Sequence, residues 1–196
     1  MTDHEPSKTR RRAGGAWPLG VAAALLLLST YDRVSAAAEL TIPATVQATL
    51  AVRILEYDRG LKAWAGPAVT IGIVEKRKNP GEDLARALSG LDAHGVPIKI
   101  VQHSYRDAET LRAWIEQNGI RLVYVGSDVG ADAAAVFSVA QRLPTLVATR
   151  EQFDRGATMG LVVKDGKPHI LVNLSAARAA RMDLDPKLLQ LSEVVR

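Results

Sequence analysis

The chain has 196 residues, of which 47% are hydrophobic and 23% are charged, and its formal net charge is +4. It contains no cysteine, which excludes thiol catalysis, disulfide bonds and lipoprotein attachment. The basic excess lies mostly in the first 36 residues, because 20 basic and 18 acidic residues follow them (+2), so neither nucleic acid nor an anionic membrane is indicated as a partner.

The N-terminal segment predicts an exported protein. Lys8 and three arginines precede an apolar run over residues 13–28, which is shorter than the roughly 20 residues that cross a bilayer. Small residues two apart follow this run, so we expect cleavage after Ala36 or Ala38. An uncleaved anchor and a twin-arginine signal are the alternatives. The sequence therefore predicts a signal peptide over residues 1–36 and a periplasmic location.

The remaining residues, 37–196, have the length of a single domain. This domain opens on an expected amphipathic helix between Pro43 and Leu61, with Pro43 in its first turn. The apolar side chains expected on one face of this helix are Val46, Leu50, Ile54 and Leu61. The charges from Glu56 to Lys62 fit a solvated helix end, while Trp64 and Trp114 are expected to anchor the core.

Four apolar, β-branched runs then alternate with helical patterns. The predicted strands are Ala68–Glu75, Val96–His103, Ile120–Gly126 and Pro144–Thr149. The predicted helices are Gly81–Gly95 (with Leu84, Leu88 and Leu91), Asp107–Gly119 (capped by Asp107 and ended by Gly119) and Gly130–Leu143. Strand and helix in alternation predict a parallel sheet with right-handed crossovers, in a three-layer, Rossmann-like α/β fold.

The C-terminal part predicts an antiparallel extension of this sheet. Two apolar runs flank residues 164–167, and Asp165 followed by Gly166 is a strong signal for a hairpin turn. A helix is expected from Ser175, and Asp185 followed by Pro186 predicts the start of a last short helix. We expect the hairpin to lie at one edge of the sheet.

The loops after the strands hold few reactive groups. Parallel sheets bind ligands at the carboxyl ends of their strands, so small-solute contacts are expected there. The candidate residues are Ser104, Ser127, Asp128, Thr149 and Arg150. The loop Gly126–Gly130 lacks the glycine fingerprint of a phosphate site. These loops therefore favour a binding protein over a nucleotide enzyme.

No metal, cofactor or catalytic centre is predicted. His94, His103 and His169 are too scattered for a metal motif. Ser127, His103 and Asp128 could meet on one rim of the sheet, but no G-x-S-x-G elbow carries the serine. We therefore expect a protein that is not an enzyme, with an exported hydrolase that uses Ser127 and His103 as an alternative.

The C-terminal residues 150–195 resemble the end of the YfiR-like periplasmic proteins. Their pattern is a glycine-led strand, an Asp-Gly hairpin, an asparagine that closes the second strand, paired alanines and Leu-Leu-x-Leu. The matching positions are Gly156, Asp165, Gly166, Asn173, Ala176, Ala177, Leu188, Leu189 and Leu191. The order of the expected elements agrees with the family over the rest of the chain.

Three departures mark a divergent branch of that family. Gly160 stands where the family has an asparagine, the disulfides of the best-known members cannot form, and a Trp-Pro segment is matched only loosely by Tyr57, Trp64 and Pro67. The resemblance implies a non-enzymatic periplasmic regulator that binds and inhibits a membrane sensor, a diguanylate cyclase, and so affects cyclic di-GMP and biofilm formation. A small-solute-binding protein resembling one lobe of a periplasmic binding protein is the alternative. A small ligand and a homodimer stay open.

Overall fold

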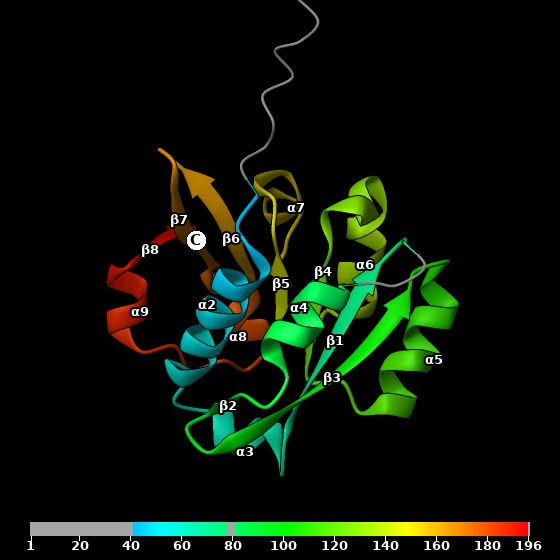
Figure 1. Cartoon of the computed structure of the whole chain (residues 1–196), viewed down its shortest axis with the longest axis horizontal. Helices are drawn as coiled ribbons and strands as arrows, with labels where there is room; N and C mark the ends of the chain where they lie inside the picture. The colour runs from blue at the N-terminus through cyan, green and yellow to red at the C-terminus, as the bar shows by residue number, and fades with distance from the viewer. Residues whose placement is uncertain (1–40, 78–80, 196) are drawn as a thin grey trace, which may run out of the picture. The chain divides into compact units, whose positions relative to one another are not determined.

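The structure is a computed structural model that describes residues 41–77 and 81–195 (Figure 1). The predicted signal peptide lies outside the described residues, so its span and cleavage stay predictions. No helix in the described ranges is long and apolar enough to cross a membrane.

One eight-stranded sheet organises the described chain, in the order β2-β3-β1-β4-β5-β6-β7-β8. Strands β3, β1, β4, β5 and β6 are parallel, and β7 returns antiparallel to β6. The predicted parallel sheet and its C-terminal hairpin are therefore confirmed. The strands are β1 (Val69–Glu75), β2 (Asp92–Ala93), β3 (Val96–Ser104), β4 (Leu122–Val125), β5 (Thr145–Val147), β6 (Met159–Lys164), β7 (Lys167–Asn173) and β8 (Ser192–Val195).

Helices cover both faces of the sheet, and each face has its own hydrophobic core. The first face carries α2 (Ala44–Glu56), α3 (Leu61–Ala65), α4 (Glu82–Leu88), α8 (Leu174–Ala179) and α9 (Pro186–Gln190). The second face carries α5 (Ala108–Asn118), the 3₁₀ helix η1 (Ser127–Asp132), α6 (Ala133–Val139) and α7 (Arg150–Asp154). The three-layer α/β fold predicted from the sequence is thus confirmed (Figure 1).

Helix α5 shows how local signals set the boundaries of an element. The Asp107 carboxylate accepts a hydrogen bond from the Thr110 backbone N–H at 2.8 Å, and this satisfies one of the free amides of the first turn. Gly119 ends the helix in a left-handed conformation, with φ at 58°. Both boundaries were predicted, because a capping side chain and a glycine act within one turn of the chain.

Two edge strands were not predicted. The helix expected over Gly81–Gly95 ends at Leu88, and the short strand β2 follows on the edge beside β3. Gly90 and Gly95 both have positive φ, so they turn the chain in place of a longer helix. At the opposite edge β8 pairs parallel to β7, so the C-terminal hairpin is not the outermost element.

The predicted opening helix is shorter than expected. Helix α2 ends at Glu56, Pro43 precedes its first residue, and Leu61 begins the separate helix α3. Val46 and Leu50 are only half-buried. The residues of α2 that face the core are Ala48, Ala51, Ile54 and Leu55. Alanines on this face let the helix approach the sheet closely. The spacing of the larger residues Val46 and Leu50 had predicted that these positions, rather than the alanines, face the core.

The charged segment after α2 is not a solvated helix end, because Asp58 is buried at 1% exposure. Its carboxylate accepts hydrogen bonds from the Trp64 indole Nε1–H at 2.7 Å, and from the backbone N–H groups of Gly60 at 2.9 Å and Asp183 at 3.0 Å. We call these three bonds the Asp58 clasp. The clasp joins the end of α2 to the segment that leads into α9, and it gives Trp64 a polar role beside its packing against the core.

The hairpin and the corner after it follow the sequence signals closely. Asp165 and Gly166 form the two-residue turn, with φ at 52° and 72°, as the twist of the flanking strands requires. Asn173 then caps α8, because its side-chain oxygen accepts a hydrogen bond from the Ala176 N–H at 3.0 Å. Ala177 is buried against the sheet. This geometry supports a scaffolding role for Asn173.

We expect Asn173→Ala to lower the free energy of unfolding by about 0.5–2 kcal/mol, the usual loss for a helix cap. Urea unfolding measures this loss, and Asn173→Asp is the matched control because it keeps an acceptor oxygen. An unchanged midpoint together with lost regulation would place Asn173 in an interface instead.

Candidate functional site

The sheet has a topological switch point between β1 and β4. The chain leaves β1 for β3 on one side and returns to β4 on the other, so the loops after β1 and β4 diverge. Open α/β sheets bind ligands at such a point, outside the carboxyl ends of the strands. The candidate site therefore comprises these two loops and the residues next to them.

Glu75 ends β1 and is buried at 6% exposure. Its Oε2 accepts a hydrogen bond from the Gly81 N–H at 2.7 Å and lies 2.8 Å from the Arg77 Nε. Gly126 packs directly on this side chain, since a Cβ there would lie 2.3 Å from Glu75 Cγ. Burial raises the pKa of Glu75, whereas the Gly81 hydrogen bond and Arg77 lower it, and Asp128 adds a smaller increase.

This raised pKa predicts a pH dependence of stability. The pKa of the folded protein lies above the ordinary value of 4.5, so the folded state holds the proton more tightly than the unfolded state. Stability from this group is therefore present below pH 4.5 and is lost as the pH rises through the folded pKa. We expect the melting temperature of Glu75→Gln to fall less than that of the wild-type protein between pH 4.5 and 7.

The control for this experiment is Glu82→Gln, because the Glu82 side chain is exposed at the start of α4. Melting curves that fall in parallel for wild type and Glu75→Gln would show that Glu75 does not carry the effect.

Asp128 joins the two diverging loops. Its Oδ2 accepts hydrogen bonds from the backbone N–H groups of Lys76 and Arg77, both at 3.1 Å, and the Arg77 guanidinium lies 3.6 Å away. Its Oδ1 is buried and has no hydrogen-bond partner in the described chain. An anion that approached these amides would meet the carboxylate already bound to them.

The other residues proposed from the sequence for solute binding fall into two groups. The Ser104 hydroxyl lies 3.4 Å from the Lys76 carbonyl, so it shares this loop with Asp128. Ser127 is exposed at the start of η1. Thr149 and Arg150 lie after β5, where Thr149 caps α7 and Arg150 pairs with Asp154 and Glu193. Their role in solute binding stays a prediction.

His103, Ser127 and Asp128 form no hydrogen-bonded triad in the described chain. The His103 ring stacks on Trp114 with ring centroids 4.8 Å apart, and its buried Nε2 has no partner among the described residues. Burial lowers the pKa of His103. No cluster of three potential metal ligands occurs within the described ranges. Covalent labelling by a serine-reactive probe tests the hydrolase alternative directly.

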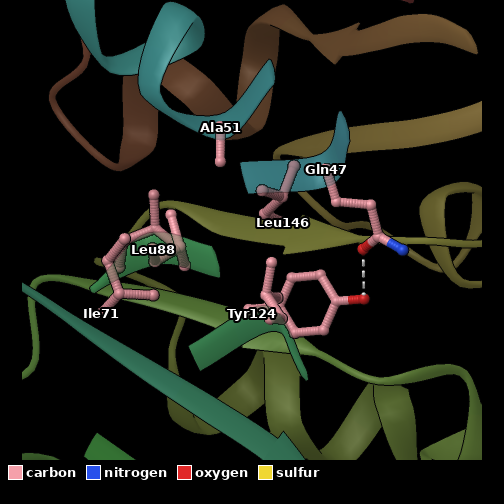
Figure 2. Close-up of a pocket in the computed structure, with 8 residues that line it drawn as sticks. Gln47, Ala51, Ile71, Leu88, Tyr124 and Leu146 are labelled. Carbon is pink, nitrogen blue, oxygen red and sulfur yellow. Dashed lines mark hydrogen bonds between the residues drawn. The ribbon is translucent and has the colours of Figure 1, made fainter. Parts of the chain in front are cut away.

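An apolar pocket lies on the first face of the sheet, beneath α2 (Figure 2). About 230 Å³ of space lies between its lining atoms and in the open solvent at its mouth, and its closed part has room for about one water molecule. The Tyr124 hydroxyl donates a hydrogen bond to Gln47 Oε1 at 2.8 Å, and Figure 2 shows this bond beside the aliphatic side chains. The lining residues are Gln47, Ala51, Ile71, Leu84, Leu88, Leu122, Tyr124 and Leu146.

Sequence reasoning missed this pocket. Gln47 and Ala51 are four residues apart on α2, as are Leu84 and Leu88 on α4, so each pair marks one helical face. These spacings show that the residues of each pair lie on one face of their helix. They do not show that the faces of α2 and α4 meet over β1, β4 and β5. That information lies in the strand order.

The C-terminal edge of the sheet exposes apolar side chains. Leu191, between α9 and β8, is 67% exposed, and Val195 is 37% exposed. Glu193 pairs with Lys164 at 3.0 Å and with Arg150 at 2.8 Å, which ties β8 to the hairpin and to α7. Of the predicted Leu-Leu-x-Leu positions, Leu188 is buried and Leu189 is half-buried, so Leu191 is the one that faces solvent.

The sequence matches a known protein family. The family model DUF4154, described as YfiR/HmsC-like, matches residues 44–193, which is most of the chain. A comparison with curated proteins finds no match.

Two solved structures share the architecture. A conserved domain protein from Vibrio cholerae is 17% identical with a TM-score of 0.53, over 81% of this chain and 61% of that one. The ABC domain from Streptococcus pneumonia, solved in complex with L-Trp, is 12% identical with a TM-score of 0.55, over 74% of this chain and 62% of that one. The chain thus spans about six tenths of the length of both structures, and at these identities the likeness shows the fold alone.

Proposed function

The chain belongs to the YfiR/HmsC-like family, and on that premise we propose that it is a non-enzymatic periplasmic regulator. It binds the periplasmic domain of a membrane signalling protein, a diguanylate cyclase, and holds that enzyme in its inactive state. Repression of this kind is a shift of population, because the regulator binds one state of its partner more tightly than the other. Release of the regulator then raises cyclic di-GMP and favours biofilm formation.

The observation that carries the proposal is the exposed C-terminal edge. Leu191 is exposed beside β8, an edge strand whose outer backbone groups can pair with an added strand of a partner. Burial of an exposed leucine side chain in a complex contributes about 1.5–3 kcal/mol. We therefore assign Leu191 and β8 to the surface that binds the partner.

Deletion of the gene and complementation with variants test the proposal. We expect the deletion to raise cyclic di-GMP in cells that contain the cyclase, and the wild-type gene to restore the low level. Leu191→Asp is expected to leave the level as high as in the deletion strain, because a charge there must be desolvated in the interface. Liquid chromatography with mass spectrometry measures the nucleotide, and circular dichroism of the purified variant checks its fold.

Leu91→Asp is the matched control, because Leu91 is also exposed (38%) but lies next to β2, at the opposite edge of the sheet. This variant is expected to repress like wild type. If Leu191→Asp repressed equally well, the partner would bind elsewhere. Unchanged cyclic di-GMP and biofilm mass in the deletion strain would refute the regulatory function itself.

A periplasmic small-solute-binding protein is the second candidate, and the switch point after β1 and β4, where the buried Asp128 Oδ1 has no partner in the described chain, is the observation that favours it. A thermal-shift screen of amino acids, nucleotides and anions separates the two functions, since a ligand that binds only the folded state raises the melting temperature. A solute that stabilises the protein while repression persists would show that both functions reside in the one domain.

A further inference from the structure

We propose that Glu193 forms a salt-sensitive latch that holds the edge strand β8 against the rest of the fold. The latch consists of the ion pairs of Glu193 with Arg150 of α7 and with Lys164 of β6. Ionic strength would thereby regulate the partner-binding edge, and this consequence rests on the proposed function, which assigns β8 to that edge. The latch itself is a property of the free protein and is measured without a partner.

The Glu193 carboxylate offers one oxygen to each cation. Its Oε1 lies 2.8 Å from Arg150 Nη1, and its Oε2 lies 3.0 Å from Lys164 Nζ. The pKa of Glu193 lies below its ordinary value because Lys164 and Arg150 donate hydrogen bonds to the carboxylate, so the group is ionised at neutral pH. Arg150 is oriented in turn by Asp154, whose two carboxylate oxygens accept from its Nε at 2.9 and 3.0 Å. The latch is therefore a network of charges and not an isolated pair.

Helix α7 gives the latch a firm anchor on the rest of the fold. Gln152 is buried at 2% exposure, and its Nε2 donates a hydrogen bond to the Gly126 carbonyl, at the end of β4, at 2.8 Å. The Thr149 hydroxyl oxygen caps the helix by accepting from the Gln152 N–H at 3.2 Å. Phe153 is buried in the core of the second face. The helix that carries Arg150 is therefore fastened to the central sheet.

Strand β8 is held weakly apart from the latch. Among the described strands it pairs with β7 alone, and none of its four residues is fully buried. The Ser192 hydroxyl donates one hydrogen bond to the Leu188 carbonyl of α9. Segments with little buried apolar surface open at a much lower free energy than the core does. The two ion pairs therefore contribute a larger share to the local stability of β8 than to that of the whole domain.

Dissolved salt reaches both cations of the latch. The Arg150 and Lys164 side chains are 52% and 56% exposed. Charges at such positions are screened, because the Debye length falls from about 30 Å at 0.01 M salt to about 3 Å at 1 M. The backbone pairing with β7 is not an interaction between full charges, so salt weakens the latch selectively. Small ions cross the outer membrane through water-filled porins, so the ionic strength around a periplasmic protein follows that of the medium.

Amide hydrogen exchange of the purified mature protein, followed by NMR at about 0.02 M and about 0.5 M NaCl, measures the opening of β8. We expect the opening of residues 192–195 to become roughly three- to tenfold more frequent in the wild-type protein at high salt. Glu193→Gln is expected to open at both concentrations as often as the wild-type strand does at high salt, because an amide does not attract the two cations. Lys164→Gln keeps the Arg150 pair, so its exchange should depend on salt less than that of the wild-type protein.

Glu151→Gln is the matched control for these variants. Glu151 also lies on α7 and is 75% exposed, but it pairs with Arg155 within the helix. We expect its β8 exchange to depend on salt as in the wild-type protein. Exchange that does not change with salt in the wild-type protein, or that changes equally in wild type and Glu193→Gln, would overturn the latch.

Complementation at one salt concentration tests the regulatory consequence. In cells that contain the cyclase, we expect Glu193→Gln to raise cyclic di-GMP about two- to fivefold above the wild-type gene, and Glu151→Gln to leave it unchanged. If Leu191→Asp raised cyclic di-GMP while Glu193→Gln did not, the latch would not regulate the partner-binding edge. If deletion of the gene changed nothing, the proposed function would fail together with this consequence, and hydrogen exchange would still decide whether the latch exists.

Discussion

Asp58→Ala is expected to destabilise the protein by about 3–5 kcal/mol, because it leaves three hydrogen-bond donors without their acceptor in a buried position. The donors are the Trp64 indole and the backbone N–H groups of Gly60 and Asp183. A domain of this size has a total stability of about 5–15 kcal/mol, so the variant loses a large share of it. Urea unfolding followed by circular dichroism measures the change.

Two further variants separate the roles of the two carboxylate oxygens. Asp58→Asn can keep Oδ1 as acceptor for both backbone groups, but it places an NH₂ group against the indole N–H. We expect Asp58→Asn to lose less stability than Asp58→Ala. Adding Trp64→Phe to Asp58→Asn is expected to recover part of that loss, because it removes the indole N–H. Asp83→Ala is the control, because Asp83 is 82% exposed and its removal should change stability by no more than about 0.5 kcal/mol. Equal effects of Asp58→Ala and Asp83→Ala would mean that the Asp58 clasp does not stabilise the fold.

Gly72→Ala is the second substitution with a large expected effect. Gly72 lies in the middle of β1, and a Cβ there would be 2.6 Å from Trp114 Cη2 and 3.0 Å from Ile120 Cγ2. The indole also stacks on His103, so it can move away only by giving up that contact. We expect a loss of about 2–3 kcal/mol from overpacking, measured as a lower urea midpoint at constant m-value.

A second substitution in the same protein should suppress this loss. Trp114→Leu frees space above β1, so the double variant is expected to be more stable than the sum of the two single changes predicts. Gly160→Ala provides a graded comparison, because its Cβ would lie 3.2 Å from Leu171 and Phe153 side-chain atoms, and the expected loss is smaller. Strictly additive effects of Gly72→Ala and Trp114→Leu would contradict this account of the clash.

The close packing at Gly160 also bears on its place in the family pattern. A Cβ at position 160 would lie 3.2 Å from side-chain atoms of Leu171 and Phe153, so the asparagine that the family has there would require these neighbours to shift in this chain.

Local signals in the sequence predicted most of the fold. Asp107 and Asp165 act within a few residues of their own position, so a cap or a turn could be read directly from the chain. The alternation of strands and helices likewise predicted the parallel sheet, because crossover connections are almost always right-handed.

The features that the sequence did not reveal depend on long-range contacts. Asp58 has the pattern of a solvated charge, and only the approach of Asp183 from the other end of the chain buries it. The pocket requires α2 and α4 to face each other over the sheet, and the exposure of Leu191 requires β8 to be the last strand. None of these relations is encoded in the spacing of neighbouring residues.

The Asp58 clasp also constrains the order in which the protein folds. The bond between the Asp183 N–H and Asp58 joins residues 125 positions apart, so its formation carries a high loop-closure entropy and adds to the contact order. A growing chain presents α2 and β1 long before its partner segment exists, and the carboxylate stays hydrated until the last residues arrive. We therefore expect completion of the sheet edge at β8 to be a late event in folding, and a chain cut short before Asp183 to lack one of the three bonds of the clasp.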